Sequence, residues 1–191
     1  MEKKIVVIGG SPRKNGCTDF LVNKICDAIK AEKIMLREMN IKLCCGCMIC
    51  LDNKTDCVIK DDMQETINKI NASDLLVFIV PNYINNVPGL FKNFVDRLLP
   101  IYESRHKKSV FVYLGAGGEV GTEQDVYDAL SIATSGMKKY LSFDCVKEFT
   151  FMCTNEPDIA EQKEKIPHCR MLLGKSHEHE IFAMLDEHKF T

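Results

Sequence analysis

The chain has 191 residues, of which 46% are hydrophobic, so it is long enough for one domain with a sizeable core. Its 25 basic and 27 acidic residues give a formal net charge of -2 and are mixed along the chain, which argues against a nucleic-acid or membrane partner. The apolar stretches are too short for a signal-peptide core or a membrane span. We therefore expect a single domain over residues 1–191, located in the cytoplasm.

Apolar runs alternate with helical periodicities along the chain. Residues 5–8 form a β-branched run that ends at Gly9-Gly10, as is typical of a central parallel strand buried on both faces. Residues 18–31 place apolar side chains on one face at helical spacing, which predicts a helix. The same reasoning predicts strands over residues 34–39, 75–80, 109–114 and 143–151, and helices over residues 61–71, 88–99, 123–140 and 157–173.

Strands that alternate with helices predict an α/β fold, in which helices cover both faces of a parallel sheet. Five strands fit the order 2-1-3-4-5 of a flavodoxin-like three-layer sandwich. In such sheets ligands bind beyond the carboxyl ends of the strands. We therefore expect ligand-binding residues in the loops 9–18, 81–87 and 115–122.

The first of these loops can hold a phosphate. It reads G-G-S-P-R-K-N-G-C-T over residues 9–18, so the amides of a helix start, the hydroxyls of Ser11 and Thr18 and the Arg13 guanidinium can converge on an anion. The Walker A and G-x-G-x-x-G patterns are both absent, which disfavours ATP and a Rossmann NAD site. For the loop taken alone, the alternative is a plain turn with a helix cap at Asn15 or Thr18.

Five of the ten cysteines lie between positions 44 and 57. The spacing C-x2-C-x2-C-x6-C over Cys44, Cys47, Cys50 and Cys57 provides enough thiolates for one [4Fe-4S] cluster. A structural zinc site, a redox-active dithiol and metal-free thiols are the alternatives. Either Cys44 or its neighbour Cys45 can serve as the first ligand on spacing alone.

The loop at residues 9–18 resembles the G-S-P-R-x-x-G-N-T phosphate loop of the NADPH-dependent FMN reductases and of their relatives, the iron-sulfur flavoproteins. It departs from that motif at Cys17, where the family usually has Asn. Residues 61–63, 73–74, 81–88 and 90–97 resemble the family at matching positions. The resemblance covers about the first 120 residues and implies a flavodoxin-like FMN-binding domain.

The resemblance also implies which residues form the sites. The iron-sulfur flavoproteins carry a compact C-x2-C-x2-C motif and a nearby fourth Cys before a segment like V-I-x-D-D-M, here residues 58–63, which makes Cys44, Cys47, Cys50 and Cys57 the cluster ligands. A homodimer or homotetramer is implied by the resemblance alone. The expected FMN-binding residues are Ser11, Arg13, Asn15, Gly16, Cys17 and Thr18 around the phosphate, and Pro81, Asn82, Tyr83, Ile84, Asn85, Gly115, Gly117 and Gly118 around the ring.

These observations predict an FMN-dependent oxidoreductase of the iron-sulfur flavoprotein type, which transfers electrons through FMN and a [4Fe-4S] cluster. NAD(P)H and a ferredoxin-like protein are both candidate redox partners, and no catalytic acid or base is required at the flavin. One alternative is a cluster-free NAD(P)H-dependent FMN, quinone or nitro-compound reductase. Another is a non-enzymatic flavodoxin-type electron carrier, which the nearly neutral charge disfavours.

Overall fold

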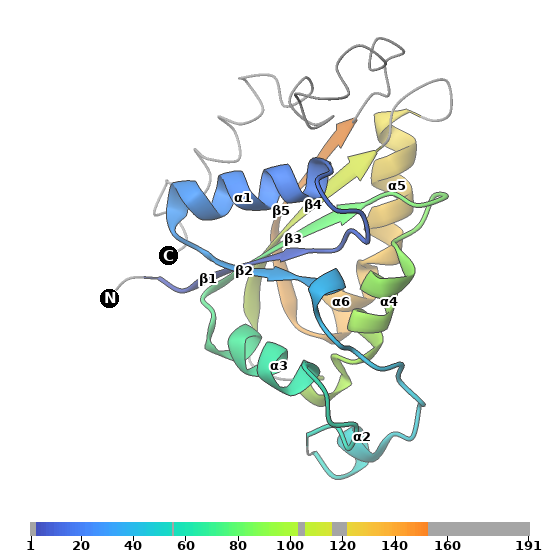
Figure 1. The fold of residues 1–191 in the computed structure, drawn as a ribbon. Coiled ribbons are helices and arrows are strands. Elements are labelled where there is room, and N and C mark those ends of the chain that lie inside the picture. Colours follow the sequence, from blue (N-terminus) through green and yellow to red (C-terminus); the bar gives the residue numbers. More distant parts are fainter. Residues whose placement is uncertain (1–2, 55, 103–105, 116–121, 153–191) are drawn as a thin grey trace.

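In a computed structural model of the chain, residues 3–54, 56–102, 106–115 and 122–152 are described. They contain one sheet of five parallel strands in the order β2-β1-β3-β4-β5. Helix α1 lies on one face and α3, α4, α5 and α6 lie on the other (Figure 1). The expected α/β fold, its layers and its strand order are confirmed.

The strands and helices have the following bounds. The strands are β1 (Ile5–Gly9), β2 (Glu32–Met35), β3 (Leu75–Pro81), β4 (Lys107–Gly115) and β5 (Phe143–Met152). The helices are α1 (Cys17–Ile29), α2 (Ile49–Asp52), α3 (Met63–Ala72), α4 (Gly89–Asp96), α5 (Glu123–Ala133) and α6 (Ser135–Tyr140), with 3-10 turns η1 (Leu36–Glu38) and η2 (Leu99–Ile101).

Several boundaries differ from those expected. The strand predicted over residues 34–39 ends at Met35, because Met35 pairs with Gly9 and the partner strand β1 ends there. The helix predicted over residues 123–140 is divided at Thr134, whose hydroxyl bonds the Leu130 carbonyl and the buried Tyr113 hydroxyl instead of facing water. The short helix α2 was not predicted. The helix predicted over residues 157–173 lies outside the described residues.

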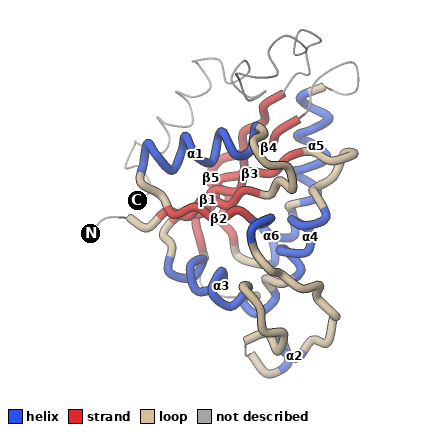
Figure 2. The backbone as a smooth tube through the Cα atoms, in the orientation of Figure 1, coloured by secondary structure: helices blue, strands red, loops and turns tan. Residues whose placement is uncertain are grey.

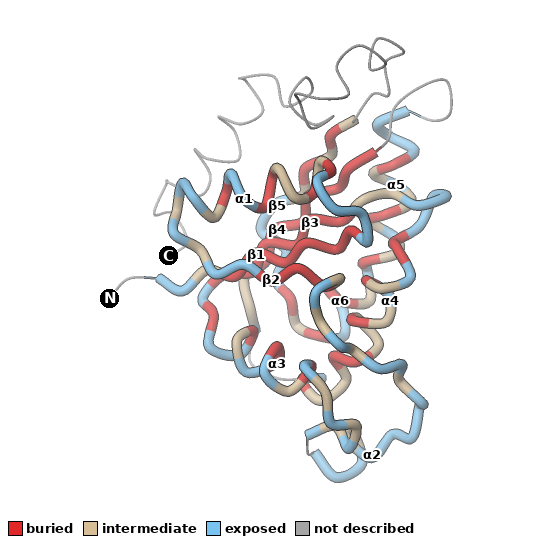
Figure 3. Tube along the Cα trace, in the orientation of Figure 1, coloured by how far each residue is buried: buried red, intermediate tan, exposed pale blue. Residues whose placement is uncertain are grey.

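Alternate residues of the central strands form two apolar layers. Val7 and Val77 pack toward α1, whereas Phe78 and Phe111 pack toward α3 to α6, with their ring centroids 4.9 Å apart. Strand β3 is buried from Leu75 to Val80, since helices cover both of its faces and strands pair with both of its edges (Figure 3). This explains why its sequence is continuously apolar. No helix in the described part of the chain is long and apolar enough to cross a membrane.

Two backbone hydrogen bonds hold the loops beyond the sheet side by side. The Gly10 amide donates to the Ile79 carbonyl at 2.9 Å, and the Asn82 amide donates to the Leu114 carbonyl at 2.7 Å. The chain segments leaving β1, β3 and β4 therefore start next to one another, and Figure 2 shows those of β1 and β3 as loops at one end of the sheet. In this strand order the change in direction of winding falls between β1 and β3, where such folds bind ligands.

The close approach at Gly10 can be tested by substitution. A Cβ at Gly10 would lie 2.7 Å from Cδ2 of the buried Phe91 ring and 3.3 Å from the Ile79 carbonyl oxygen. We expect Gly10→Ala to lower the free energy of unfolding by about 1–3 kcal/mol, because overpacking displaces the ring. Gly89→Ala is the matched control, since a Cβ there meets nothing within 4 Å and Ala favours helix. Urea denaturation measures both; equal stability of the two variants would contradict the tight contact.

Candidate functional site

The loop between β1 and α1 gathers polar groups around the start of a helix. The side chains of Ser11 and Thr18 are buried, and Ser11 Oγ accepts the Arg13 amide hydrogen at 3.1 Å. Gly16 precedes the first turn of α1 and provides no side-chain cap for it. A Cβ on Gly16 would lie 3.3 Å from Cδ of Arg13, so the Arg13 side chain passes over this helix end. Such an arrangement suits an anion.

A partly buried ion pair, with side chains 11% and 12% exposed, supports this loop. Asn15, at φ 57, donates its amide hydrogen to Asp19 Oδ2 at 2.7 Å. Asp19 Oδ1 pairs with Arg37 Nη1 at 2.6 Å, and the same nitrogen donates to the Arg13 carbonyl at 3.3 Å. Arg37 thus neutralises a carboxylate that would otherwise repel an anion at the helix start. The sequence reasoning missed this pair, because β2 and its following turn bring Arg37 to α1 only in the folded chain.

The loop after β3 is a tight turn. Pro81 is the last residue of β3, and Tyr83 and Asn86 exchange backbone hydrogen bonds of 2.8 and 3.1 Å. Ile84 and Asn85 between them both have φ 50, as the two central residues of a type I′ turn do. Ile84 is completely exposed at the tip. A β-branched residue in this conformation is strained, and such strain is concentrated at ligand sites and switch regions.

Asn82 has an unused acceptor at the same edge of the sheet. Its Nδ2 donates to Asn85 Oδ1 at 3.4 Å, but its own Oδ1 is buried and receives no hydrogen bond from the described residues. A buried polar atom without a partner costs about 1–3 kcal/mol, so a donor supplied by a ligand would be favourable.

The glycines after β4 are only partly within the described residues. Gly115 ends β4, and a Cβ there would lie 2.6 Å from Met152 Sδ and 2.8 Å from Val126 Cγ2. Packing against β5 and α5 is therefore a sufficient reason for this glycine. Gly117 and Gly118, which the sequence also assigned to the ring site, lie outside the described residues.

The strain at the tip of the turn predicts a gain in stability on its removal. Ile84→Gly should raise the free energy of unfolding by about 0.5–1 kcal/mol, because glycine adopts positive φ without the penalty of a β-branched side chain. The gain is partly offset by the greater freedom of glycine in the unfolded chain. Ile84→Val keeps the branch and should show no gain. Thermal denaturation of the two variants compares them, and a loss of stability in Ile84→Gly would argue against strain.

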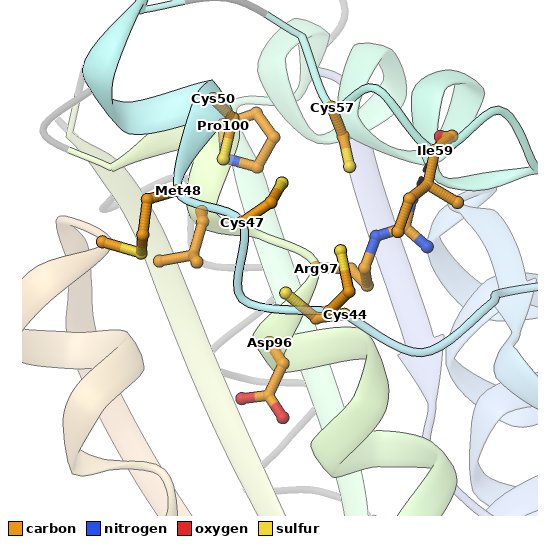
Figure 4. A pocket seen from close by; sticks show the side chains of 11 residues that line it. Cys44, Cys47, Met48, Cys50, Cys57, Ile59, Asp96, Arg97 and Pro100 are labelled. Atoms are coloured by element: carbon orange, nitrogen blue, oxygen red, sulfur yellow. Dashed lines mark hydrogen bonds between the residues drawn. The ribbon is translucent and has the colours of Figure 1, made fainter.

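The cysteine-rich segment forms a loop between β2 and α3 that includes α2. Cys44, Cys45, Cys47, Cys50 and Cys57 all line one pocket, together with Arg97 and the η2 residues Leu99 and Pro100. All five thiols are free. Figure 4 shows the sulfurs of Cys47, Cys50 and Cys57 turned toward the same space. The fold therefore brings together all four cysteines that the sequence assigned as ligands.

The cysteine thiols have the type and number that a metal centre needs, but in this structure they are not arranged around a metal ion. Burial raises the pKa of the Cys50 thiol, and the nearby Cys57 and Cys47 add to this rise. Thiolates favour zinc and iron-sulfur clusters. Within the described residues, however, no three His, Cys, Asp or Glu side chains are placed to hold a metal ion. Cys44 is partly buried and Cys45 exposed, and since both line the pocket, either can be the first ligand.

A buried ion pair lies at the base of this loop. The side chains of Arg97 and Asp61 are both 0% exposed, and Nη1–Oδ2 and Nη2–Oδ1 distances of 2.6 and 3.0 Å make the pair bidentate. Burial acts to raise the pKa of Asp61, but hydrogen bonds from Arg97 and from the Lys42 and Met63 amides outweigh it and hold the pKa below its ordinary value.

Only one member of the Arg97–Asp61 pair could be recognised from the sequence. Asp61 and Asp62 read as the acidic start of a helix, and Asp62 does precede α3, yet its carboxylate accepts the Asn40 amide hydrogen at 2.7 Å and makes no cap. The usable signal was Arg97 itself, a charge three residues after the buried Phe94 on the same helical face. Its partner, thirty-six positions earlier, is set by the tertiary fold.

The parallel sheet in the order β2-β1-β3-β4-β5 with helices on both faces defines a flavodoxin-like protein. Residues 3–143 match the family model for NADPH-dependent FMN reductase. The chain belongs to this family.

Relatives and solved structures agree with this assignment. Residues of the chain are 40% identical over 99 positions to an iron-sulfur flavoprotein of Archaeoglobus fulgidus, covering 49% of this chain and 48% of that protein, so the chain spans about half the length of that relative. Identity is 31% over 136 positions to an iron-sulfur flavoprotein of Methanocaldococcus jannaschii, covering 65% of this chain and 70% of that protein. The structure of an NAD(P)H:quinone oxidoreductase from Methanothermobacter marburgensis superposes with a TM-score of 0.67 at 14% identity, over 100% of this chain and 99% of that chain, which shows a shared fold.

Proposed function

We propose that this protein is an FMN-dependent oxidoreductase of the iron-sulfur flavoprotein type, with FMN at the ends of β1, β3 and β4 and a [4Fe-4S] cluster in the cysteine pocket. Membership of the FMN reductase family supports the flavin and the reductase chemistry. The observation that carries the proposal is the uncapped start of α1, with Ser11 and Thr18 buried beside it and Arg13 folded over it. FMN exchanges electrons in pairs or singly, and a cluster exchanges them singly.

The phosphate would bind to the start of α1. Ser11, Arg13 and Thr18 supply side-chain groups, and Gly16 and Cys17 supply backbone at the helix end. Asn15 has a different part, since its amide hydrogen is already bonded to Asp19 and its positive φ shapes the turn.

The ring would lie against the turn after β3. Asn82 Oδ1, which has no partner in the described part of the chain, can accept a hydrogen bond from the edge of the ring, and Tyr83 offers an aromatic surface. Pro81, Ile84 and Asn85 complete this wall, while Gly115, Gly117 and Gly118 are proposed for the opposite edge. None of these groups is needed as an acid or base; they orient the flavin and set its potential.

Cys44, Cys47, Cys50 and Cys57 would hold the cluster, which the names of the archaeal relatives and the shared pocket support. A cluster-free NAD(P)H-dependent reductase is the second candidate, and the absence of a metal-ligand geometry among the described residues favours it. NAD(P)H or a ferredoxin-like protein as partner, a homodimer or homotetramer and a cytoplasmic location stay predictions. The formal net charge of -2 argues against a flavodoxin-type carrier.

Phosphate recognition separates FMN from riboflavin. Arg13→Ala should weaken FMN binding about 10- to 100-fold, because a charge-assisted hydrogen bond contributes about 1.5–3 kcal/mol, while riboflavin binding stays unchanged. Quenching of flavin fluorescence gives both dissociation constants. Lys14→Ala, the exposed neighbouring cation, is the matched control for general charge and should have little effect. An equal loss in the two variants, or wild-type FMN affinity in Arg13→Ala, would contradict the phosphate site.

Iron and sulfide analysis tests the cluster. Protein purified without oxygen should contain about four iron and four sulfide per chain, with an absorption beyond the flavin bands that reductant bleaches. Cys57→Ala should lose most of both while keeping FMN. Cys145→Ala, which removes an exposed thiol outside the pocket, should keep all three. Full flavin occupancy without iron and sulfide in the wild type would replace this proposal with the cluster-free reductase.

A further inference from the structure

The cysteine loop leaves and rejoins the domain at a narrow neck. We define the loop as residues 43–58, with Lys42 before it and Ile59 after it. Arg97 Nη1 donates to the Lys42 carbonyl at 2.7 Å, and Arg97 Nη2 donates to the Ile59 carbonyl at 3.3 Å. One guanidinium therefore holds both ends of the loop.

Asp61 fixes the orientation of that guanidinium. Its two oxygens bind the two terminal nitrogens of Arg97, and Oδ2 also accepts the Lys42 amide hydrogen at 2.8 Å. Oδ1 accepts the Met63 amide hydrogen at 3.1 Å. The Asp61 carboxylate thus links Lys42, where the chain enters the cysteine loop, to the start of α3. Because the pair is fully buried and bidentate, its geometry leaves little freedom to the chain at Lys42.

Neighbouring side chains reinforce the same neck. Gln64 Nε2 donates to the carbonyls of Cys57 and Ile59 at 3.3 and 2.8 Å, and Gln64 Oε1 accepts the Asp61 amide hydrogen at 3.0 Å. Asn93 Nδ2 donates to the Ile41 carbonyl at 2.8 Å. The loop is therefore anchored to α3 by one end and to α4 by the other.

Arg97 also contacts the pocket that the thiols line. It is one of the residues that line the pocket, as is Cys57. Its Nε is buried and has no hydrogen-bond partner among the described residues.

We propose that Arg97, oriented by Asp61, is the positioning residue of the cysteine site: it closes the neck of the loop so that the cysteine thiols face one pocket before a metal or cluster is bound. This inference rests on the proposed function in that a thiophilic metal centre occupies the pocket. The role requires the fork of the guanidinium, because its two nitrogens reach two different carbonyls while also binding the carboxylate. A lysine ammonium brings the same charge but not this geometry.

The test uses the full-length, FMN-loaded chain with its metal removed and its thiols reduced, titrated anaerobically with Co²⁺ alone. Absorption from thiolate-to-cobalt charge transfer reports the thiol ligands, and FMN affinity and thermal denaturation report the rest of the fold. We expect Arg97→Lys to weaken Co²⁺ binding about 10- to 100-fold, as loss of a group that orients ligands does, with FMN affinity unchanged. Lys92→Ala, which removes an exposed ion pair on the same helix, should match the wild type in every readout.

A double variant covers the risk that a single change leaves a buried charge and unfolds the chain. Arg97→Met with Asp61→Leu replaces the pair by apolar groups, which proteins often accept without loss of stability. It should fold, bind FMN and bind Co²⁺ as weakly as Arg97→Lys. Wild-type Co²⁺ affinity in either folded variant would overturn the positioning role while leaving the cluster proposal intact. Loss of FMN binding in both variants would also overturn the positioning role, because it would show that the Arg97–Asp61 pair supports the whole fold.

The wild type separates the two proposals. A wild-type protein that binds Co²⁺ and carries iron and sulfide, with folded variants that do the same, defeats only the role of Arg97. A wild-type protein that binds neither Co²⁺ nor a cluster defeats the role of Arg97 together with the cluster.

Discussion

The parallel pairing of β3 with β1 on one side and β4 on the other places the carboxyl ends of these three strands at one edge of the sheet. Helices cover both faces of β3, so residues 75–80 are buried and apolar. Packing on both faces also fixes the register of β3 with its neighbours. A shift of this strand would break the bonds from the Gly10 amide to the Ile79 carbonyl and from the Asn82 amide to the Leu114 carbonyl. The candidate flavin site is thus a consequence of how the core is packed.

Helix α4 connects the two candidate redox sites. It begins at Gly89, directly after the turn proposed for the flavin ring, and Arg97 at the neck of the cysteine loop follows its last residue. An eight-residue helix spans about 12 Å, and Phe91 and Phe94 bury this one against the sheet. The two sites are therefore joined by a short rigid element and not by a flexible linker. Asn93 on the same helix donates to the Ile41 carbonyl, which precedes the cysteine loop. Residues at the ends of α4 and on one side of it therefore adjoin or contact the neighbouring loops.

Two arginines, one partly buried and one fully buried, orient the two loops in similar ways. Arg37 pairs with Asp19 and bonds a carbonyl of the β1–α1 loop, whereas Arg97 pairs with Asp61 and bonds two carbonyls at the cysteine loop. In each case a carboxylate fixes the guanidinium and the guanidinium fixes the backbone. A planar group with several donors suits this task, because it can satisfy a carboxylate and a carbonyl at once. Arg37 lies outside the motifs that drew attention to the loops, and Arg97 is the last residue of the segment 90–97 that resembles the family.

The sequence by itself determined the elements that depend on local pattern. The apolar run at residues 75–80 predicted the buried strand β3, and the loop at residues 10–13 was expected before a helix, because burial on two faces and helix starts depend on neighbouring residues. The cysteine spacing predicted one shared site, and the four cysteines line one pocket. The phosphate and the cluster themselves stay predictions. The tertiary structure alone decided the break at Thr134, the partners of Asp19 and Asp61, and the lack of a partner for Asn82 Oδ1 among the described residues. These features join residues far apart in the chain, and only packing decides which of them meet.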